Sequence, residues 1–244
     1  MKGIVLAGGL GTRLNPLTKI TNKHLLPVYN SPMIYYPIKS LVDAGIDDIM
    51  IVCGGNHAGE FLRLLGNGSE FGLKHLNYAY QENEGGIAEA LGLCRHFVDD
   101  DKTVVFLGDN IIESSIKPAV DEFKRQEKGG RILLKKVKDP RDYGVAKFGP
   151  DNKVSEIQEK PENPPSNYAV VGIYMYDSQV FDIIDTLEVS NRGELEITDV
   201  NNAYLRKNQL QYSVLEGWWA DAGASIDAYY NTIKVVAENK RNGS

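Results

Sequence analysis

A glycine-rich loop follows the first apolar segment of the chain, and it constrains the fold more than any other stretch. Residues 3–6 predict a buried strand, and the sequence after it reads Ala-Gly-Gly-Leu-Gly-Thr-Arg. Three glycines within four residues let backbone N–H groups approach a phosphate, because no Cβ stands in the way. Arg13 and Lys23 add a planar and a compact cation suited to phosphate oxygens. The segment therefore predicts an anion-binding loop at the end of a strand.

Two common glycine-loop motifs do not fit this segment. A P-loop ends in Gly-Lys-Ser/Thr, whereas Gly11 is followed here by Thr12 and Arg13. The dinucleotide fingerprint needs a further glycine or alanine where Leu14 stands, and an acidic residue about 20 positions on. The first acidic residue of the chain is Asp43. A glycine-rich turn between a strand and a helix, without a ligand, remains the alternative to an anion-binding loop.

Length and composition are those of an ordinary globular protein. The chain has 244 residues, 42% hydrophobic and 25% charged, so we expect a single domain over residues 1–244 with one continuous core. No apolar run approaches the ~18 residues of a membrane span, and the first strand follows Met1 and Lys2 without a signal peptide. We therefore expect a cytoplasmic protein that contacts no membrane. The two cysteines and four histidines lack metal-binding spacing, which argues against zinc.

Charge is distributed unevenly along the chain. The net charge of −6 argues against a nucleic-acid-binding protein. Residues 1–42 contain five lysines and arginines and no acidic residue, a local charge of +5, which leaves −11 for the rest of the chain. The amino-terminal segment is therefore expected to bind an anionic ligand.

The hydrophobic pattern alternates between strands and helices through residues 1–130, and strands follow one another more closely after that. Such an order predicts an α/β fold with a mixed, mostly parallel central sheet and helices on both faces. Strands are expected over residues 3–6, 48–53, 73–81, 103–107, 131–137, 144–148, 154–158, 169–176 and 210–216. Helices are expected over residues 31–44, 58–65, 87–94, 116–126, 178–187, 198–206 and 226–240.

Four charged residues lie just after predicted strands or shortly before predicted helices. Asp109 follows the strand 103–107, and Asp221 lies in a Trp-Trp-Ala-Asp run before the last helix. Two such carboxylates, together with substrate phosphates, suffice to hold Mg²⁺ if they converge, although an aspartate in this position is also a common helix cap. Lys160 and Arg192 either offer cations to a second phosphate or belong to solvated turns.

These motifs together resemble those of the sugar-1-phosphate nucleotidyltransferases, over essentially the whole chain. The matching stretches are residues 6–14, 22–27, 32–37, 108–110, 159–161, 166–169 and 192–199. The glycine-rich loop is shared by the pyrophosphorylases of this family, whereas residues 192–199 are typical of its thymidylyl-transferring branch. The resemblance implies a Rossmann-like nucleotidyltransferase fold, with a nucleotide-binding half of about residues 1–130 and a sugar-phosphate-binding half of about residues 131–244.

The activity implied by this resemblance is a Mg²⁺-dependent single displacement. The phosphate of glucose 1-phosphate would attack the α-phosphorus of dTTP and give dTDP-glucose and pyrophosphate, for use in deoxysugar biosynthesis. We also expect a homo-oligomer. Two alternatives remain: a uridylyl- or cytidylyltransferase acting on glucose 1-phosphate, and a sugar-nucleotide-binding module that has lost catalysis.

The resemblance also implies a role for individual residues. The nucleotide would be bound by Leu6, Gly8, Gly9, Gly11, Thr12, Arg13, Gln81 and Gly86. The sugar phosphate would be bound by Asn110, Gly144, Glu159, Lys160, Val171, Gly172 and Arg192. Catalytic roles would fall on Arg13, Lys23, Asp109, Lys160 and Arg192, and Mg²⁺ would be bound by Asp109 and Asp221.

Two stretches depart from the family pattern. The loop between Gln81 and Gly86 usually carries prolines and an aspartate, but it reads Glu-Asn-Glu-Gly here, which bears on base selectivity. Residues 219–222 read Trp-Ala-Asp-Ala in place of the usual Trp-Leu-Asp-Thr, so a hydroxyl is lost. The carboxylate expected to hold the metal is retained.

Overall fold

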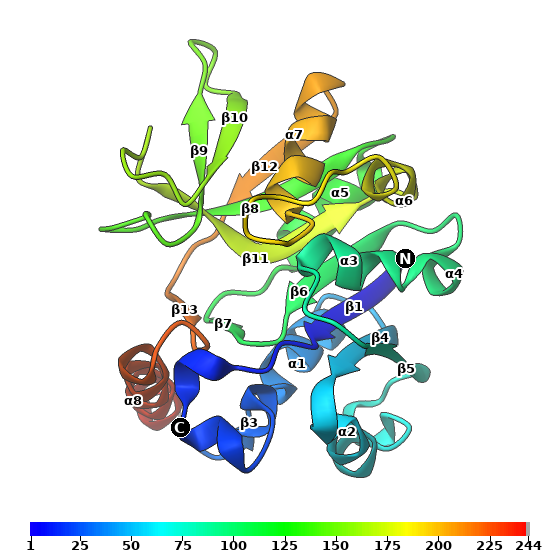
Figure 1. Ribbon diagram of the computed structural model, residues 1–244, viewed down its shortest axis with the longest axis vertical. Helices are drawn as coiled ribbons and strands as arrows, with labels where there is room; N and C mark the ends of the chain where they lie inside the picture. Colours follow the sequence, from blue (N-terminus) through cyan, green and yellow to red (C-terminus); the bar gives the residue numbers. More distant parts are fainter. Residues whose placement is uncertain (243–244) are drawn as a thin grey trace.

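The central sheet begins as a parallel α/β structure. The computed structural model, shown in Figure 1, describes residues 1–242. Three of the first strands, residues 2–7, 48–54 and 103–107, are rich in Val, Ile and Leu, which suits them to burial on both faces. Each parallel connection requires a crossover, here through helices. These strands lie side by side, all parallel, in the order β6 (Thr103–Leu107), β1 (Lys2–Ala7), β4 (Asp48–Gly54) and β5 (His75–Gln81).

The second half of the sheet is built around one long strand, β11 (Tyr168–Tyr176). It pairs in the antiparallel sense with β6, β8 (Gly130–Lys136) and β9 (Gly144–Phe148). Strand β10 (Val154–Glu159) extends the edge beyond β9, and β12 (Leu210–Val214) runs parallel to β8. Because β11 joins β6 directly, one continuous sheet spans both halves of the chain. The predicted mixed α/β sheet is confirmed.

Helices cover both faces of the sheet, as predicted, and each face has its own apolar layer. Successive strand residues point to opposite faces, so Ile4 and Leu6 pack in one layer, and Val5 and Ala7 in the other. Each fully buried Val, Leu or Ile contributes about 1.5–3 kcal/mol. The first layer is completed by α3 (Ile87–Gly92), α4 (Arg95–Val98), α6 (Gln179–Ile184) and α7 (Ile197–Arg206), and the second by α1 (Tyr35–Asp43), α2 (Ala58–Leu65) and α5 (Lys117–Arg125).

The last helix, α8 (Ile226–Asn242), packs beside the amino-terminal segment. Figure 1 shows it next to the part of the chain that carries β2 (Pro27–Val28) and β3 (Ser31–Pro32). The hydroxyl of Tyr229 donates a hydrogen bond to the carbonyl of Pro27 at 2.6 Å. A third, smaller apolar cluster fills the space between them. The helix thereby fixes the segment that follows the glycine-rich loop.

A two-stranded ribbon joins positions that are far apart in the sequence. Strand β7 (Asn110–Ile112) follows β6 after a short turn, and β13 (Trp219–Asp221) pairs with it in the antiparallel sense, with Asp221 opposite Asn110. The pairing brings Asp221 to the carboxyl end of β6, where Asp109 also lies. Neither strand is predicted from the sequence, because three residues are too few to show an alternating pattern.

Most predicted elements agree with the structure to within a few residues, and two helices differ. The helix expected over 31–44 begins only at Tyr35, because β3 pairs with β2 in a short hairpin. The helix expected over 87–94 ends at Gly92, and a second short helix that was not predicted, α4, follows from Arg95. No helix within residues 1–242 is long and apolar enough to cross a membrane.

Candidate active site

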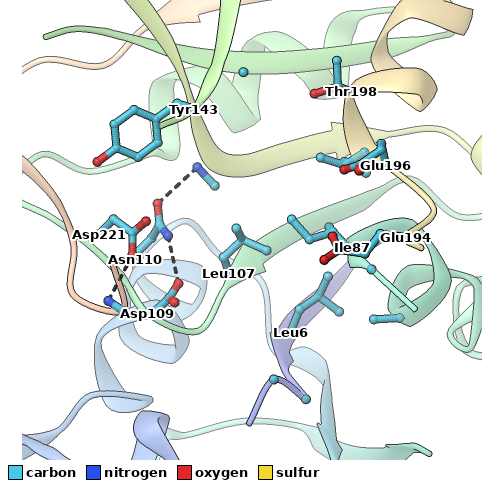
Figure 2. A pocket seen from close by; sticks show the side chains of 18 of the residues that line it. Leu6, Ile87, Leu107, Asp109, Asn110, Tyr143, Glu194, Glu196, Thr198 and Asp221 are labelled. Atoms are coloured by element: carbon cyan, nitrogen blue, oxygen red, sulfur yellow. Dashed lines mark hydrogen bonds between the residues drawn. The ribbon is translucent and has the colours of Figure 1, made fainter. Parts of the chain in front are cut away.

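One cavity collects nearly all of the residues singled out in the sequence. It has a volume of about 430 Å³ and lies at the carboxyl ends of β1, β5 and β6, where open α/β sheets bind ligands. Residues of both halves of the chain line it, as Figure 2 shows. The predicted site residues along its wall are Leu6, Gly8, Gly9, Gly11, Thr12, Arg13, Lys23, Gln81, Gly86, Asp109, Asn110, Gly144, Glu159, Lys160, Gly172, Arg192 and Asp221.

Val171 is the predicted site residue that does not line the cavity. It is fully buried in the apolar layer on the opposite face of the sheet, because residues alternate along β11. Its neighbours Val170 and Gly172 face the cavity instead. The Val171 side chain therefore does not face the cavity, and the predicted part of Val171 in binding the sugar phosphate stays a prediction for its backbone.

The glycine-rich loop already holds an anionic group in this structure. Gly11 adopts the left-handed conformation with φ of 68°, and a Cβ there would lie only 2.9 Å from the Cβ of Lys23, so glycine is required. The N–H of Leu10 donates to a carboxylate oxygen of Glu84 at 2.7 Å. This bond favours an anion-binding loop over a turn without a ligand.

Lys23 and Asp109 form an ion pair at the inner end of the loop. Asn22 caps a 3₁₀ helix (Lys23–Leu25) by accepting the backbone N–H of His24, and Nζ of Lys23 lies 2.5 Å from Oδ2 of Asp109. Burial opposes both charges, but each charge stabilises the other. The pKa of Lys23 is raised, and that of Asp109 is held below its usual range. The pair is therefore ionised at neutral pH.

Asp221 lies beside this pair in a different environment. Its Oδ1 accepts the backbone N–H of Gly223 at 3.0 Å, while burial and the negative charge of Asp109 raise its pKa to about 7. In the part of the chain that the structure describes, no three acidic, His or Cys side chains enclose a metal by themselves. Two repelling carboxylates still fit Mg²⁺, which proteins usually hold through one or two carboxylates plus substrate phosphates.

Asn110 connects the elements that meet at the two aspartates. Its Nδ2 donates to Oδ1 of Asp109 at 3.1 Å, and Figure 2 shows it between Asp109 and β11. Its Oδ1 accepts the backbone N–H of Gly172 at 3.1 Å and Nε1–H of Trp219 at 2.7 Å. A Cβ on Gly172 would lie 2.8 Å from the Asn110 amide, so this approach requires glycine. The amide thus fixes β7, β11 and β13 relative to one another.

The other end of the cavity carries a cluster of charges around Arg192. Its Nε and Nη2 donate to the two carboxylate oxygens of Glu196 at 2.9 and 2.6 Å, and its Nη2 lies 3.5 Å from Glu159. Glu159 also accepts the Thr198 hydroxyl at 2.6 Å. The hydrogen bond to Glu196 raises the pKa of Arg192. Since Nη1 bonds to no residue from 1 to 242, it is the part of the guanidinium that a ligand can reach.

Lys160 is the second cation at this end. It follows β10 at the rim of the cavity, and its φ of 43° lies in the left-handed region, which is uncommon for a residue with a side chain. Its backbone N–H donates to the carbonyl of Tyr143 at 3.0 Å. This hydrogen bond holds Lys160 and Tyr143 at neighbouring points of the wall. Burial and, to a smaller extent, the negative charge of nearby Asp221 raise the pKa of Tyr143 to about 12.

Asn201 is a lining residue that the sequence-based predictions missed. It is 1% exposed; its Oδ1 accepts the hydroxyl of Tyr176 at 2.6 Å, and its Nδ2 has no hydrogen-bond partner among the described residues. An unpaired buried donor costs about 1–3 kcal/mol, so this amide is suited to a ligand hydroxyl or a water molecule. The i, i+3 spacing of Thr198 and Asn201 in the predicted helix is the signal that places both on one face.

Comparison with known proteins identifies the family of this chain. Residues 2–239 match the family described as nucleotidyl transferase, and the chain belongs to that family. The family resemblance stated from the motifs is confirmed.

Individual relatives narrow the similarity further. The glucose-1-phosphate thymidylyltransferase of an Actinoplanes species is 44% identical over 230 residues, 93% of this chain and 75% of the relative. A low-salt glycan biosynthesis nucleotidyltransferase of Haloferax volcanii is 40% identical over 241 residues, 98% of this chain and 67% of the relative. A crystal structure from Bacillus anthracis is that of a provisionally named glucose-1-phosphate thymidylyltransferase in complex with a sucrose. Its sequence is 51% identical to this chain, and the two structures superpose with a TM-score of 0.92 over 96% of this chain and 94% of that one. A UDP-glucose pyrophosphorylase, 22% identical with a TM-score of 0.85 over 98% of both chains, shares the fold.

Proposed function

We propose that this protein transfers the thymidylyl group of dTTP to glucose 1-phosphate and releases pyrophosphate. The observation that carries the proposal is the ion pair of Lys23 and Asp109 beside a second, half-buried carboxylate, Asp221, at the end of an anion-binding loop. Relatives that are 44% identical are named for this activity. Displacement at phosphorus depends on positioning and charge neutralisation, and it needs no protein nucleophile because the sugar phosphate is already ionised.

The triphosphate lies against the glycine-rich loop in this proposal. Its oxygens compete with the Glu84 carboxylate for the N–H of Leu10, because one donor cannot serve both. Arg13 offers a planar fork to two phosphate oxygens, and Lys23 supplies a point charge as pyrophosphate departs. The base or ribose packs on the apolar wall of the cavity, which Figure 2 shows as Leu6, Ile87 and Leu107.

Asp109 and Asp221 are the residues that would hold Mg²⁺. When bound, this ion neutralises phosphate charge and orients the reacting phosphorus. The protein's own contribution is to keep Asp109 ionised through Lys23 and oriented through Asn110. Asp221 is oriented by the N–H of Gly223 and by the pairing of β13 with β7.

The sugar phosphate occupies the end of the cavity lined by the second half of the chain. Lys160 and Nη1 of Arg192 meet its phosphate oxygens, while Glu159 and the free amide hydrogens of Asn201 meet hydroxyl groups of the sugar. The N–H of Gly172 is already bonded to Asn110, so this glycine contributes the space that its missing side chain leaves.

A product assay tests the proposal. The purified protein with Mg²⁺, dTTP and glucose 1-phosphate is expected to form dTDP-glucose and pyrophosphate in equal amounts, and a chelator is expected to stop the reaction. UTP should serve as a weaker substrate, since a methyl group in an apolar pocket is worth only about 1–3 kcal/mol. ATP and GTP should not be substrates, because a purine base is larger than the pyrimidine that the pocket is proposed to bind. No dTDP-glucose from the folded protein would reject the proposal, and turnover confined to UTP or CTP would favour the uridylyl or cytidylyl alternative.

A further inference from the structure

The side-chain amide of Gln81 lies between the glycine-rich loop and a carboxylate that belongs to α3. Gln81 is the last residue of β5 and is 7% exposed at the cavity wall. Its Nε2 donates to Oε2 of Glu89 at 3.0 Å. Its Oε1 lies against the loop, where a Cβ on Gly8 would be only 2.3 Å away. The two ends of the amide therefore have different surroundings.

Space for this arrangement is provided by two glycines. A Cβ on Gly8 would displace Oε1 of Gln81, and a Cβ on Gly85 would lie 2.0 Å from Oε2 of Glu89. The pair of side chains is thus packed between the glycine-rich loop and the loop that follows β5, and Glu89 cannot move toward Gly85 without a clash. The geometry limits how far the carboxylate can retreat from the amide.

The chemistry of the pair determines which way the amide faces. An ionised carboxylate has no hydrogen to donate, so it must face the NH₂ end of Gln81 and not the carbonyl oxygen. Reversing the amide would place two acceptors against each other and leave both unpaired. Within residues 1–242, Oε1 accepts no hydrogen bond, and it is free to accept one from a ligand in the cavity. Glu89 itself does not line the cavity.

We propose that Glu89 is a positioning residue that sets pyrimidine specificity by fixing the orientation of the Gln81 amide. In this orientation the amide presents a carbonyl oxygen beside an N–H. Uracil and thymine present the complement, a ring N–H beside a carbonyl oxygen, whereas cytosine presents a ring acceptor beside an amino group. A cytosine held in the same position as uracil would pair only with a reversed amide, which Glu89 opposes. This inference rests on the proposed function, since it places a pyrimidine nucleotide in the cavity.

The test compares UTP with CTP, which differ in this hydrogen-bonding pattern and lack the thymine methyl group. The quantity measured is the ratio of kcat/KM for UTP to that for CTP, with glucose 1-phosphate and Mg²⁺. Glu89→Gln keeps the size of the side chain and lets it accept or donate, so it permits both orientations of Gln81. We expect this variant to lower the ratio about ten-fold, the effect of about one hydrogen bond, chiefly by improving CTP.

A matched control is available in the loop that follows β5. Glu82 is exposed and follows Gln81 directly, and Glu82→Gln makes the same change of charge without altering the partner of the amide. It is expected to keep the wild-type ratio. Glu89→Ala, which removes the partner altogether, is expected to lower the ratio as Glu89→Gln does.

An unchanged ratio in both Glu89 variants would overturn the inference. This outcome includes an equal loss of kcat/KM with UTP and CTP, which a merely structural role predicts. A binding measurement tests this inference separately from the proposed function. It is the shift in thermal midpoint that UTP or CTP produces in the absence of sugar phosphate. If wild-type protein forms no sugar nucleotide, the proposed function fails, while the difference between the UTP and CTP shifts still tests Glu89.

Discussion

At the scale of single residues, the two aspartates of the cavity differ in the charges around them. Asp109 has the ammonium of Lys23 at 2.5 Å, which favours its ionised form. Asp221 forms no ion pair within the described chain, and both burial and Asp109 disfavour its charge. The same substitution is therefore expected to act on stability with opposite signs at the two positions.

We expect Asp221→Asn to raise the thermal midpoint at pH 8 without divalent ions, and Asp109→Asn to lower it. The folded-state pKa of Asp221 is raised from 3.8 to about 7, so its charge lowers stability increasingly as pH rises through this window, and asparagine removes that cost. Asparagine at position 109 leaves Lys23 buried without its partner. Both variants should lose turnover by about 10²–10³-fold.

Calorimetry and pyrophosphate release measure the two effects separately. Wild-type turnover of either variant at saturating Mg²⁺ would contradict the assignment of these carboxylates to the metal. A lower midpoint for Asp221→Asn would contradict the electrostatic account of its surroundings.

His24 is expected to make stability depend on pH. Its ring is buried, its Nδ1 lies 2.7 Å from Oδ1 of Asn22, and burial with the charge of Lys23 lowers its pKa to about 3. An unfolded histidine titrates near 6.5. Between pH 6.5 and 3 the unfolded state therefore binds a proton that the native state does not. As the pH is lowered through this range, the free energy of unfolding falls by up to about 1.4 kcal/mol per pH unit.

Urea unfolding at pH 7.5 and pH 5 measures this loss. His24→Gln is expected to reduce the difference between the two pH values, because the titrating ring is gone. An equal difference in the variant and the wild type would assign the pH dependence to other groups.

At the scale of elements, the site depends on the ribbon of β7 and β13, which the Asn110 amide ties to β11. Asn110→Ala leaves the buried Gly172 N–H and the half-buried Trp219 indole N–H without their acceptor. A buried donor left unpaired costs about 1–3 kcal/mol. We expect a lower thermal midpoint, a higher KM for glucose 1-phosphate and a red shift of tryptophan emission. The measurements are calorimetry, steady-state kinetics and fluorescence.

Asn110→Asp is the matched comparison for this substitution. A carboxylate still accepts from Gly172 and Trp219 but cannot donate to Asp109, and it adds a negative charge beside it. This variant should keep the wild-type emission and lose turnover. Wild-type midpoint and emission in Asn110→Ala would show that other contacts hold the ribbon.

The elements that the sequence predicts well are those whose pattern is local. The helix over 58–65 and the strands over 103–107 and 144–148 have the same bounds in the structure, because apolar periodicity within each segment decides them. Strands β7 and β13 escape prediction because each is defined by a partner more than 100 residues away. The side of β11 that Val171 faces is likewise decided by how that strand joins the sheet.

The site residues also divide into those that a local sequence pattern predicts and those that depend on tertiary packing. Motifs identify the glycine-rich loop, Lys23 and the two aspartates, since their chemistry is recognisable in a few consecutive residues. The unpaired amide of Asn201 and the contact between Gln81 and Glu89 depend on the orientation of side chains after packing. No short stretch of sequence specifies such orientations.

At the scale of the whole molecule, the pairing of β11 with β6 joins the two halves into one sheet. We propose that residues 1–244 form a single domain, as the sequence predicts. Unfolding in urea followed by far-UV circular dichroism and by tryptophan fluorescence should then give coincident transitions. The two tryptophans, Trp218 and Trp219, lie where the halves meet, so separate transitions would show that the halves unfold independently.

The ribbon of β7 and β13 also affects when during synthesis the enzyme becomes active. Asp221 is translated 112 residues after Asp109, which takes roughly 6 to 22 s at about 5–20 residues per second. During that interval the nascent chain carries the glycine-rich loop, Lys23 and the first aspartate, but it lacks the second. No ribosome-bound intermediate can therefore bring the two aspartates together before β13 emerges and docks. If the two aspartates hold Mg²⁺, as proposed, catalytic activity therefore reports that β13 has docked on β7.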